Sequence, residues 1–589
     1  MKLRWREKEV VDPDSVGRLR RELNSLPEAL ARLLVLRGVR SIDDARRFFR
    51  GTLEDLPDPF LMRDMEAAAD RLALAVQRRE PVLVYGDYDV DGTTAVALLT
   101  LFLRGEGVPA LYHVPDRIME GYGLNLAAVD RAVEAGAALI VALDCGVTAL
   151  EVAQFARGRG VDLIICDHHT PGPALPDALA VLDPKRADCP YPFKELSGCG
   201  VGYKLVSATL LRLGREVREA DAYLDLVAIS CASDIVPVNG ENRVLMREGF
   251  RRIEESPRPG LAVLAEEAGL TLKPCNTGRI VFGIGPRLNA AGRMMHARHA
   301  VELLLAPNAD VARPIAASLE EANRQRRLLD DQILAQACEK VESLGSVAGH
   351  VLYDPTWHPG IIGIVASRIV ERYYRPTVML GRVNGIVKGS ARSIAGINIY
   401  EALSRCSDLL DAFGGHDYAA GLSLAESRVQ EFTDRFTSVI EEVADRELFV
   451  PSIDVDAHLD LAELDGRFWS VLRQFAPFGP SNSRPVFRSS DLRIVGRPRT
   501  VGRDGTHLKF SVCAPNHPGV RHEIIGFNLG SHLATVEQCT REGSALDILF
   551  SLDENEWRGT RSLQLQVRDV RPRTSRLPES TNTGPQAHA

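Results

Sequence analysis

The residues best suited to carry chemistry are three acids at alternate positions, Asp87, Asp89 and Asp91, directly after a short apolar run. Alternate side chains of an extended segment face the same way, so we expect these carboxylates to converge. Crowded carboxylates raise one another's pKa unless a cation neutralises them, and Mg²⁺ and Mn²⁺ prefer oxygen ligands. The motif therefore predicts a divalent-cation site. Taken alone, it fits a calcium-type loop or a solvated turn equally well.

Further acids and two histidines follow other apolar segments. Asp144 follows one such run, Asp167-His168-His169 follows the next, and Asp234 follows an apolar helical pattern. Taken singly, the histidines fit a surface turn and Asp234 fits a helix-capping residue. Convergence of four such sites favours a two-metal centre, in which one carboxylate bridges ions about 3.5–4 Å apart.

Convergence requires a particular arrangement of strands. The apolar runs at 82–85, 139–143 and 161–166 alternate with helical patterns. This alternation indicates βαβ units and a parallel sheet that is buried on both faces. Ligands of open α/β sheets bind beyond the carboxyl ends of the strands, which is where the acids and histidines lie. The fold class predicted for this part of the chain is α/β.

The rest of the chain divides by changes in pattern. A charged, helix-favouring stretch precedes a second, smaller α/β pattern, and short strands with turns then favour a β-barrel or sandwich. The expected regions are an N-terminal helical region at 1–55, an α/β catalytic domain at 56–312, a helical connector at 313–345, a smaller α/β domain at 346–450, a β-barrel domain at 451–572 and a disordered tail at 573–589.

Composition limits the class of protein. Ten cysteines form no Cys-x-x-Cys pair in 589 residues, so we expect reduced cysteines and a metal held by oxygen and imidazole. No apolar run is long enough to span a bilayer, and the charged N-terminus is unlike a secretory signal, which predicts a cytoplasmic protein without membrane partners. The net charge of −8 is neutral with respect to nucleic-acid binding, because a basic groove can coexist with an acidic remainder.

At this point the motifs resemble a known family. The segments around Asp87–Gly92, Asp144, Asp167–His169 and Asp234 look like the four ordered motifs of the DHH phosphoesterase superfamily. The segments 389–393 and 414–421 resemble its C-terminal DHHA1 substrate domain, and 285–293 and 477–482 resemble segments of its RecJ branch. The resemblance covers roughly residues 80 to 570, and its β-rich end resembles an oligonucleotide-binding (OB) barrel. One departure is Pro480-Ser481-Asn482-Ser483, where the family commonly has Gly and Pro in place of the two serines.

The resemblance implies 5′→3′ removal of 5′-mononucleotides from single-stranded DNA, in DNA repair and recombination, with two Mn²⁺ or Mg²⁺ ions as cofactor. It implies that Asp89 and Asp91 each bind a metal, that Asp144 bridges the ions, and that His168 and Asp234 complete the ligands. His169 would lie behind the ligands or contact phosphate. Asp87 is assigned no ligand role and could orient a metal-bound water. A single-strand-binding protein and a helicase are the protein partners to be expected.

Recognition of a strand end needs a second set of residues. A terminal phosphate suits arginine forks and hydroxyl donors. The candidates are Arg117, Arg293, Ser390 and Arg392, together with Gly414, Gly415 and His416, which could approach a backbone phosphate closely. The competing interpretations are surface ion pairs for the arginines and an ordinary tight turn for the glycines.

The β-rich region offers a basic stretch and aromatic side chains. The basic residues are Arg493, Arg497, Arg499, Arg503 and Lys509, and the possible base-stacking residues are Phe510, Phe527 and Trp557. The alternatives are that these aromatic residues lie in the barrel core and that the domain closes as a lid over the strand.

Two other functions remain open. One is a phosphodiesterase for cyclic dinucleotides or very short oligonucleotides, although such substrates hardly need the extra N-terminal and β-rich regions. The other is a non-catalytic replication scaffold, although the chain keeps every acid and histidine of the motifs. Hydrolysis, rather than transfer to a protein nucleophile, is expected because no nucleophilic serine or cysteine accompanies the acids.

Overall fold

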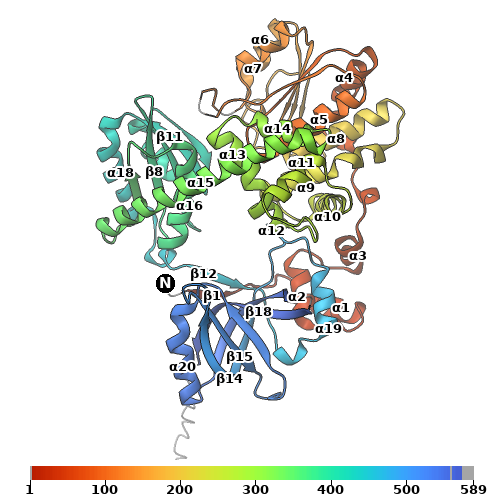
Figure 1. The fold of residues 1–589 in the computed structure, drawn as a ribbon. Coiled ribbons are helices and arrows are strands. Elements are labelled where there is room, and N and C mark those ends of the chain that lie inside the picture. Colours follow the sequence, from red (N-terminus) through yellow and green to blue (C-terminus); the bar gives the residue numbers. More distant parts are fainter. Residues whose placement is uncertain (1–2, 118, 122, 558–559, 574–589) are drawn as a thin grey trace, which may run out of the picture. The chain divides into compact units, whose positions relative to one another are not determined.

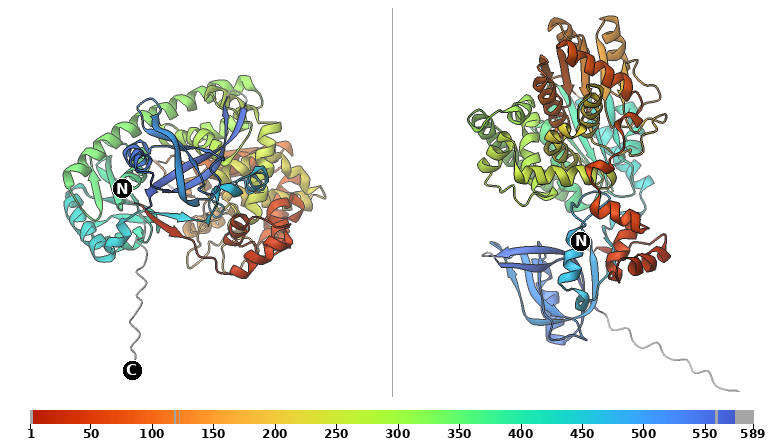
Figure 2. Two further views of the ribbon diagram at one scale, coloured as in Figure 1. Left: turned by 90° about the horizontal axis from the view of Figure 1, so that it is seen from below. Right: turned by 90° about the vertical axis from the view of Figure 1, so that its right-hand side faces the viewer.

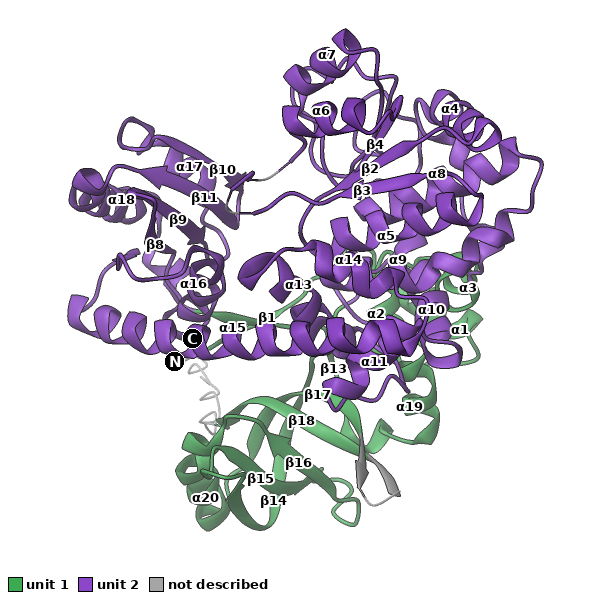
Figure 3. Cartoon of the chain, turned by 45° about the horizontal axis from the view of Figure 1, so that its top comes forward, with its two compact units in different colours: residues 1–50, 451–476, 483–589 green, residues 51–450, 477–482 purple. Residues whose placement is uncertain are grey.

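The computed structural model describes residues 3–117, 119–121, 123–557 and 560–573, with the side chains of 555–562 left out. The chain forms two compact units (Figure 3). Unit 1 consists of Met1–Arg50, Pro451–Ala476 and Ser483–Ala589, and unit 2 consists of Gly51–Val450 and Pro477–Asn482. No helix of the described residues is long and apolar enough to cross a membrane. All ten cysteines are free, as predicted.

Unit 2 begins with a five-stranded parallel sheet in the order β3-β2-β4-β5-β6. Its strands are β2 (Val82–Gly86), β3 (Ala110–His113), β4 (Leu139–Leu143), β5 (Asp162–Cys166) and β6 (Ala180–Leu182). The three predicted strands are confirmed as β2, β4 and β5, whose apolar residues are almost all buried. The sequence patterns missed the two outer strands.

Helices cover both faces of this sheet (Figure 1). Alternate residues of the strands pack on one face against α4 (Met65–Arg78), α5 (Val90–Gly105) and α8 (Gly198–Arg212). The intervening residues pack on the other face against α6 (Leu126–Glu134) and α7 (Leu150–Gly158). A sheet buried on both faces needs apolar residues at every strand position, which explains the continuous apolar runs.

A helical layer follows the sheet. It contains α9 (Leu224–Ser233), α10 (Gly240–Glu255), α11 (Pro259–Glu267), the short helices α12 (Thr277–Arg279) and η4 (Ile280–Ile284), α13 (Gly285–Met294) and α14 (Arg298–Leu305). The predicted helical connector is α15 (Ala309–Leu344), a single long helix (Figure 3).

The second domain of unit 2 has a mixed sheet in the order β10-β11-β9-β8-β7. Its strands are β7 (His350–Tyr353), β8 (Thr377–Val383), β9 (Ile386–Arg392), β10 (Ala412–His416) and β11 (Ala419–Leu424). Helix α16 (Pro359–Tyr373) packs with α15 on one face, and α17 (Ile399–Ser404) and α18 (Val429–Val443) pack on the other.

Unit 1 contains the predicted OB-like barrel, visible as strands that curl round on themselves (Figure 2). The strands β14 (Phe487–Val501), β15 (His507–Cys513), β16 (His522–Gly526), β18 (Thr560–Pro572) and β17 (Leu546–Trp557) pair in that order. A further pairing of β17 with β14 closes the barrel. The short strand β13 (Ala457–His458) extends β14, and α19 (Gly466–Arg473) and α20 (Leu533–Glu542) complete the C-terminal part.

The N-terminal segment belongs to the same unit as the barrel. It contains α1 (Pro13–Glu22), α2 (Glu28–Leu36) and α3 (Ile42–Arg50), in agreement with its helical pattern. It also contains a strand that the pattern did not predict, β1 (Arg4–Glu7), which pairs in parallel with β12 (Ser452–Val455). The predicted disordered tail lies, after residue 573, outside the described residues.

Candidate active site

The acids and histidines singled out in the sequence lie together at the carboxyl ends of β2, β4 and β5. His168 Nε2 is 3.2 Å from Asp144 Oδ1, 3.6 Å from Asp234 Oδ2 and 3.8 Å from Asp91 Oδ2. Potential ligand atoms of Asp87, Asp89 and Asp144 also lie within 4.8 Å of one another. We call Asp87, Asp89, Asp91, Asp144, His168 and Asp234 the acid cluster.

Asp91 is held firmly at the meeting point of three helices. Its carboxylate accepts the N–H groups of Gly198 and Cys199, both at 2.7 Å, at the N-terminus of α8. It also accepts the hydroxyl of Ser230 in α9 at 2.7 Å. Helix N-termini favour negative charge, so the start of α8 is a favourable place for this carboxylate.

Asp144 occupies a strained position. Its φ is +60°, in the left-handed region that non-glycine residues rarely adopt. A Cβ at position 198 would lie 2.6 Å from the Asp144 Cβ, so Gly198 is needed for α8 to approach this closely. Such strain persists only where the surroundings over-determine it, and it occurs often at functional sites.

Burial and mutual repulsion make the acid cluster costly to maintain. Burial, followed by the charges of Asp91 and Asp89, raises the pKa of Asp144 well above its usual range and that of Asp234 to about 8. Burial and the Asp89 charge likewise raise the pKa of Asp87. Burial also lowers the pKa of His168, which favours the neutral imidazole that can bind a metal. A divalent cation would remove the repulsion.

The cluster also contains buried polar atoms without hydrogen-bond partners among the described residues: Asp87 Oδ1, Asp144 Oδ1 and His168 Nε2. Buried polar groups normally have partners, because leaving one unsatisfied costs about 1–3 kcal/mol. Oxygen and imidazole donors in this state fit Mn²⁺ or Mg²⁺, which accept both kinds of ligand.

Asp167 organises the cluster, although the sequence motif suggested no role for it. Its carboxylate accepts the N–H groups of Val147 at 2.9 Å and His168 at 2.8 Å, and it pairs with His169 Nδ1 at 2.7 Å. Burial alone would lower the pKa of His169, but the hydrogen bond and charge of Asp167 outweigh it and raise this pKa to about 9. The pairing with Asp167 also fixes the orientation of the His169 ring.

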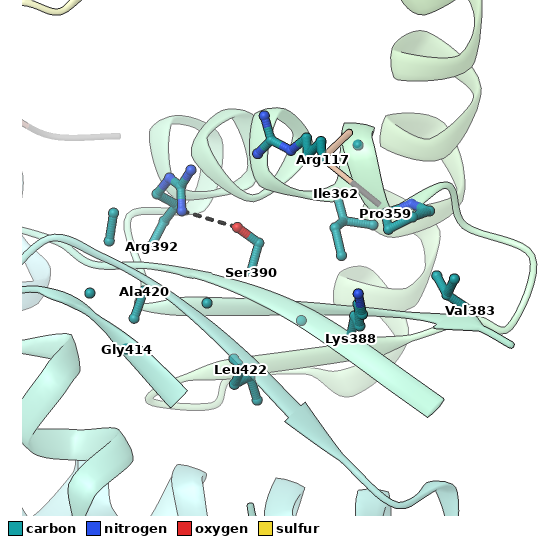
Figure 4. A pocket seen from close by; sticks show the side chains of 15 residues that line it. Arg117, Pro359, Ile362, Val383, Lys388, Ser390, Arg392, Gly414, Ala420 and Leu422 are labelled. Atoms are coloured by element: carbon teal, nitrogen blue, oxygen red, sulfur yellow. Dashed lines mark hydrogen bonds between the residues drawn. The ribbon is translucent and has the colours of Figure 1, made fainter. Parts of the chain in front are cut away.

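Most of the predicted phosphate-binding residues line one pocket of unit 2, of about 450 Å³ (Figure 4). Arg117, Ser390, Arg392, Gly414 and Gly415 all line it. Arg392 donates to the Ser390 hydroxyl at 3.1 Å, and the Arg117 guanidinium lies 4.8 Å from the centre of the Tyr88 ring. We call this cavity the arginine pocket.

The other two predicted phosphate-binding residues do not line this pocket. Arg293 donates to the carbonyl of Gly360, a pocket residue, at 2.8 Å. Burial, followed by the charges of Arg117, Arg326 and Arg392, lowers its pKa to about 9. His416 lies exposed at the end of the edge strand β10. Lys388 also lines the pocket, although it was not predicted from the sequence. Its alternate spacing with Ser390 and Arg392 along β9 indicates that the three side chains share one face of the strand.

In the barrel of unit 1, only some of the residues predicted to contact nucleic acid are exposed. Arg493, Arg497, Arg499 and Arg503 are exposed, whereas Lys509 pairs with Glu523 at 2.7 Å. Phe510 is buried in the barrel core and is not a stacking platform, whereas Phe527 is 51% exposed. The side chain of Trp557 lies outside the described residues.

Comparison with known protein families gives matches along most of the chain. Residues 81–231 match the N-terminal domain of the DHH family, residues 345–442 match the DHHA1 domain, and residues 455–569 match the RecJ OB domain.

Individual relatives agree with these matches. The single-stranded-DNA-specific exonucleases RecJ of Bacillus subtilis and Escherichia coli are each 36% identical to this chain, over 97% and 93% of it and over 71% and 96% of their own lengths. The crystal structure of Thermus thermophilus RecJ in complex with Mn²⁺ matches 97% of this chain and 80% of its own, at a TM-score of 0.81 and 29% identity. A structure of exonuclease RecJ bound to manganese matches 65% of this chain and 96% of its own, at a TM-score of 0.57 and 35% identity.

Proposed function

The chain belongs to the RecJ family of single-stranded-DNA-specific exonucleases and is a metal-dependent exonuclease, and we propose that it degrades single-stranded DNA from the 5′ end to 5′-mononucleotides. The observation that carries the catalytic part of this proposal is the contact of His168 Nε2 with Asp144 Oδ1 at 3.2 Å. Both atoms are buried, and neither has a hydrogen-bond partner among the described residues, which fits two side chains that would hold a metal ion.

We assign two ions, Mn²⁺ or Mg²⁺, to the acid cluster. Asp89, Asp91, Asp144, His168 and Asp234 would hold them, with Asp144 between the two, since it has potential ligand partners on both sides of the cluster. Bound there, the ions would lower the pKa of a water molecule and polarise the phosphoryl oxygens. Asp87, which also lies within reach of a metal shared with Asp89 and Asp144, would bind an ion or orient a metal-bound water molecule.

The protein's own groups would prepare the phosphate for attack. His169, oriented by Asp167 through Nδ1, would donate a hydrogen bond from Nε2 to a non-bridging phosphate oxygen. Arg293 lies among other arginines with no carboxylate hydrogen-bonded to it in the described part of unit 2, so its guanidinium is available for an anion. Groups fixed in advance by the fold can stabilise developing negative charge without reorganising.

The 5′ end would be recognised in the arginine pocket. A terminal phosphate carries more charge than a phosphodiester, and Arg392 with Ser390 offers a paired guanidinium and hydroxyl for it. Arg117 would contribute a second guanidinium. Gly414 and Gly415, which have no side chains, would let the DNA backbone approach β10 closely. His416, outside the pocket lining, would contact the strand farther along.

The exposed arginines of the barrel support single-strand binding by unit 1. A role in DNA repair and recombination, a cytoplasmic location, and assistance from a single-strand-binding protein and a helicase form the wider part of the proposal. The role in repair and the two protein partners follow from the substrate, because double-stranded DNA must first be made single-stranded.

The proposal is tested with a single-stranded oligonucleotide labelled separately at its 5′ and 3′ ends and incubated with Mn²⁺. Early release of the 5′ label as a mononucleotide is expected, with none from an Asp144→Ala variant. Early release of the 3′ label would overturn the polarity but leave the phosphodiesterase. Cleavage of dinucleotides without cleavage of long strands would favour a small-substrate enzyme instead.

A further inference from the structure

The arginine pocket is larger than one phosphate group requires. Its volume of about 450 Å³ falls in the range of roughly 300–1,000 Å³ that is typical of sites for whole small molecules. The residues assigned so far, Arg117, Ser390 and Arg392 with the two glycines, account for only part of the lining. The remaining part is bounded by Ile362, Val383, Lys388 and Leu422.

Lys388 is directed to this pocket by the register of β9. Val387 and Ala391 point into the core with no exposed area, so Lys388, Ser390 and Arg392 share the opposite face of the strand. Alternate residues of a strand are about 6.6 Å apart, so a lysine, a hydroxyl and an arginine follow one another along one line. Figure 4 shows Arg392 and Lys388 on either side of Ser390.

The pocket lining contains three cationic side chains and no carboxylate. The neighbours of Lys388 across the sheet are Gly381 and Ser423, which carry no charge. Among the described residues, Lys388 has no hydrogen bond or ion pair. A phosphomonoester brings a charge of at most about −2, which is less than three cations can neutralise.

The two ends of the line differ in their distance from the acid cluster. Arg117 lies against the ring of Tyr88, which stands between Asp87 and Asp89 in the chain, so the arginine end of the pocket is the end next to the acid cluster. Lys388 lies on the other side of Ser390 from Arg392 (Figure 4). The Lys388 end is therefore the outer end of the pocket, beyond the proposed terminal phosphate.

We propose that this outer end binds the additional phosphates of a 5′-triphosphate, with Lys388 as their cationic partner and the first phosphate on Ser390 and Arg392. The inference rests on the proposed function, because it extends the same end-binding pocket. The substrate class would thus include strands that carry a 5′-triphosphate as well as monophosphorylated ends.

The test measures the affinity of full-length protein for two single-stranded DNA oligonucleotides that differ only in a 5′-monophosphate or a 5′-triphosphate. We expect the wild type to bind the triphosphate at least threefold more tightly. Lys388→Ala should lose this preference and Lys388→Arg should keep it. Lys273→Ala, which removes an exposed lysine elsewhere in unit 2, is the matched control and should keep it as well.

Equal or weaker binding of the triphosphate by the wild type would overturn the inference. So would a Lys388→Ala variant that weakens both oligonucleotides by the same factor, because Lys388 would then serve the first nucleotide. Arg392→Ala separates this from the proposed function: it should weaken both oligonucleotides at least tenfold. If it weakens neither, the pocket is not the end-binding site at all.

Discussion

Unit 2 buries two groups of charged side chains in different ways. In the acid cluster, several carboxylates face one another around a histidine. Lys204 in α8 and Glu241 in α10 form the second group. They are 2% and 4% exposed, and Lys204 Nζ lies 2.6 Å from Glu241 Oε2. Tyr191 donates to the same carboxylate oxygen at 3.0 Å.

The difference separates a site that needs a ligand from one that needs none. The Lys204–Glu241 pair supplies its own counter-charge, so it serves the fold. The acid cluster holds more carboxylates than the neighbouring His169 can balance, so a divalent cation would relieve the remaining repulsion. Burial alone does not distinguish the two sites; the balance of the neighbouring charges does.

The largest expected effect is the loss of catalysis on removing the central acid. Asp144→Ala should lower the rate of single-strand hydrolysis roughly 1,000-fold or more, because several kcal/mol of metal-based stabilisation is lost and each 1.36 kcal/mol is a factor of ten. The metal-free variant should be at least as stable as the wild type in denaturant unfolding, since one repelling charge has gone. Asp177→Ala is the matched control and should keep full activity, because Asp177 lies beside the start of β5, at the end of the strand away from the acid cluster.

Breaking the buried Lys204–Glu241 pair should lower stability and leave catalysis nearly unchanged. Glu241→Leu leaves the Lys204 ammonium buried without its partner and should lower the free energy of unfolding by about 3–5 kcal/mol. The folded fraction should hydrolyse DNA at nearly the wild-type rate. The double variant Lys204→Met/Glu241→Leu should recover most of the lost stability. Failure of the double variant to recover would mean that packing, rather than charge, dominates this site.

Metal removal should sharpen the same contrast. Mn²⁺ at 100 times its dissociation constant should stabilise the wild type by about 2.7 kcal/mol, because the ion binds only the folded state. We expect this gain to vanish in Asp144→Ala and to persist in the Lys204→Met/Glu241→Leu variant, as measured by thermal unfolding with and without chelator. A gain that survives in Asp144→Ala would place the ion elsewhere.

The smallest expected effect concerns the imidazole of His350, a buried ionisable group that is neutral in the folded protein. Burial, with a contribution from Arg375, lowers the pKa of His350 to about 4. The unfolded chain binds a proton below about pH 6.5 and the folded chain does not, so stability is complete above pH 6.5 and falls as the pH is lowered toward 4. The loss should reach about 2 kcal/mol when the pH is lowered from 7 to 5, as measured by urea unfolding. His350→Gln should flatten this part of the profile, and an unchanged profile would contradict the assignment.

The sequence predicted the catalytic half of the fold because its physical signals are local. Strands β4 and β5 are continuous apolar runs, and parallel strands deliver the residues that follow them to one edge. Strand β3 mixes polar and apolar residues, and β6 has only three residues, Ala180–Leu182, so neither produced a pattern long enough to recognise. Asp167 was missed as an organiser because its bonds to the adjacent His168 and His169 and to Val147 depend on the path of the chain after β5, which a sequence pattern does not show.

Elsewhere, the sequence contained signals that were incompletely used. In β15, the alternation of Leu508, Phe510 and Val512 with polar residues predicts that Phe510 points inward, as it does. The alternation of Lys388 with Ser390 and Arg392 likewise placed the lysine on the pocket face. The pairing of β1 with β12 had no such signal, because strand partners more than 400 residues apart leave no mark in a single sequence.

The assembly of unit 1 from separate segments has a consequence for biosynthesis. Trp5 donates to Asp569 at 2.7 Å, so one of the first residues made contacts one of the last residues described. At about 5–20 residues per second, a ribosome needs on the order of half a minute to two minutes to join them. During that time the segment Gly51–Val450 of unit 2 can fold, whereas the N-terminal helices cannot yet pack against the segments of unit 1 that are made last. The barrel of unit 1 is therefore the last part of the protein to be completed.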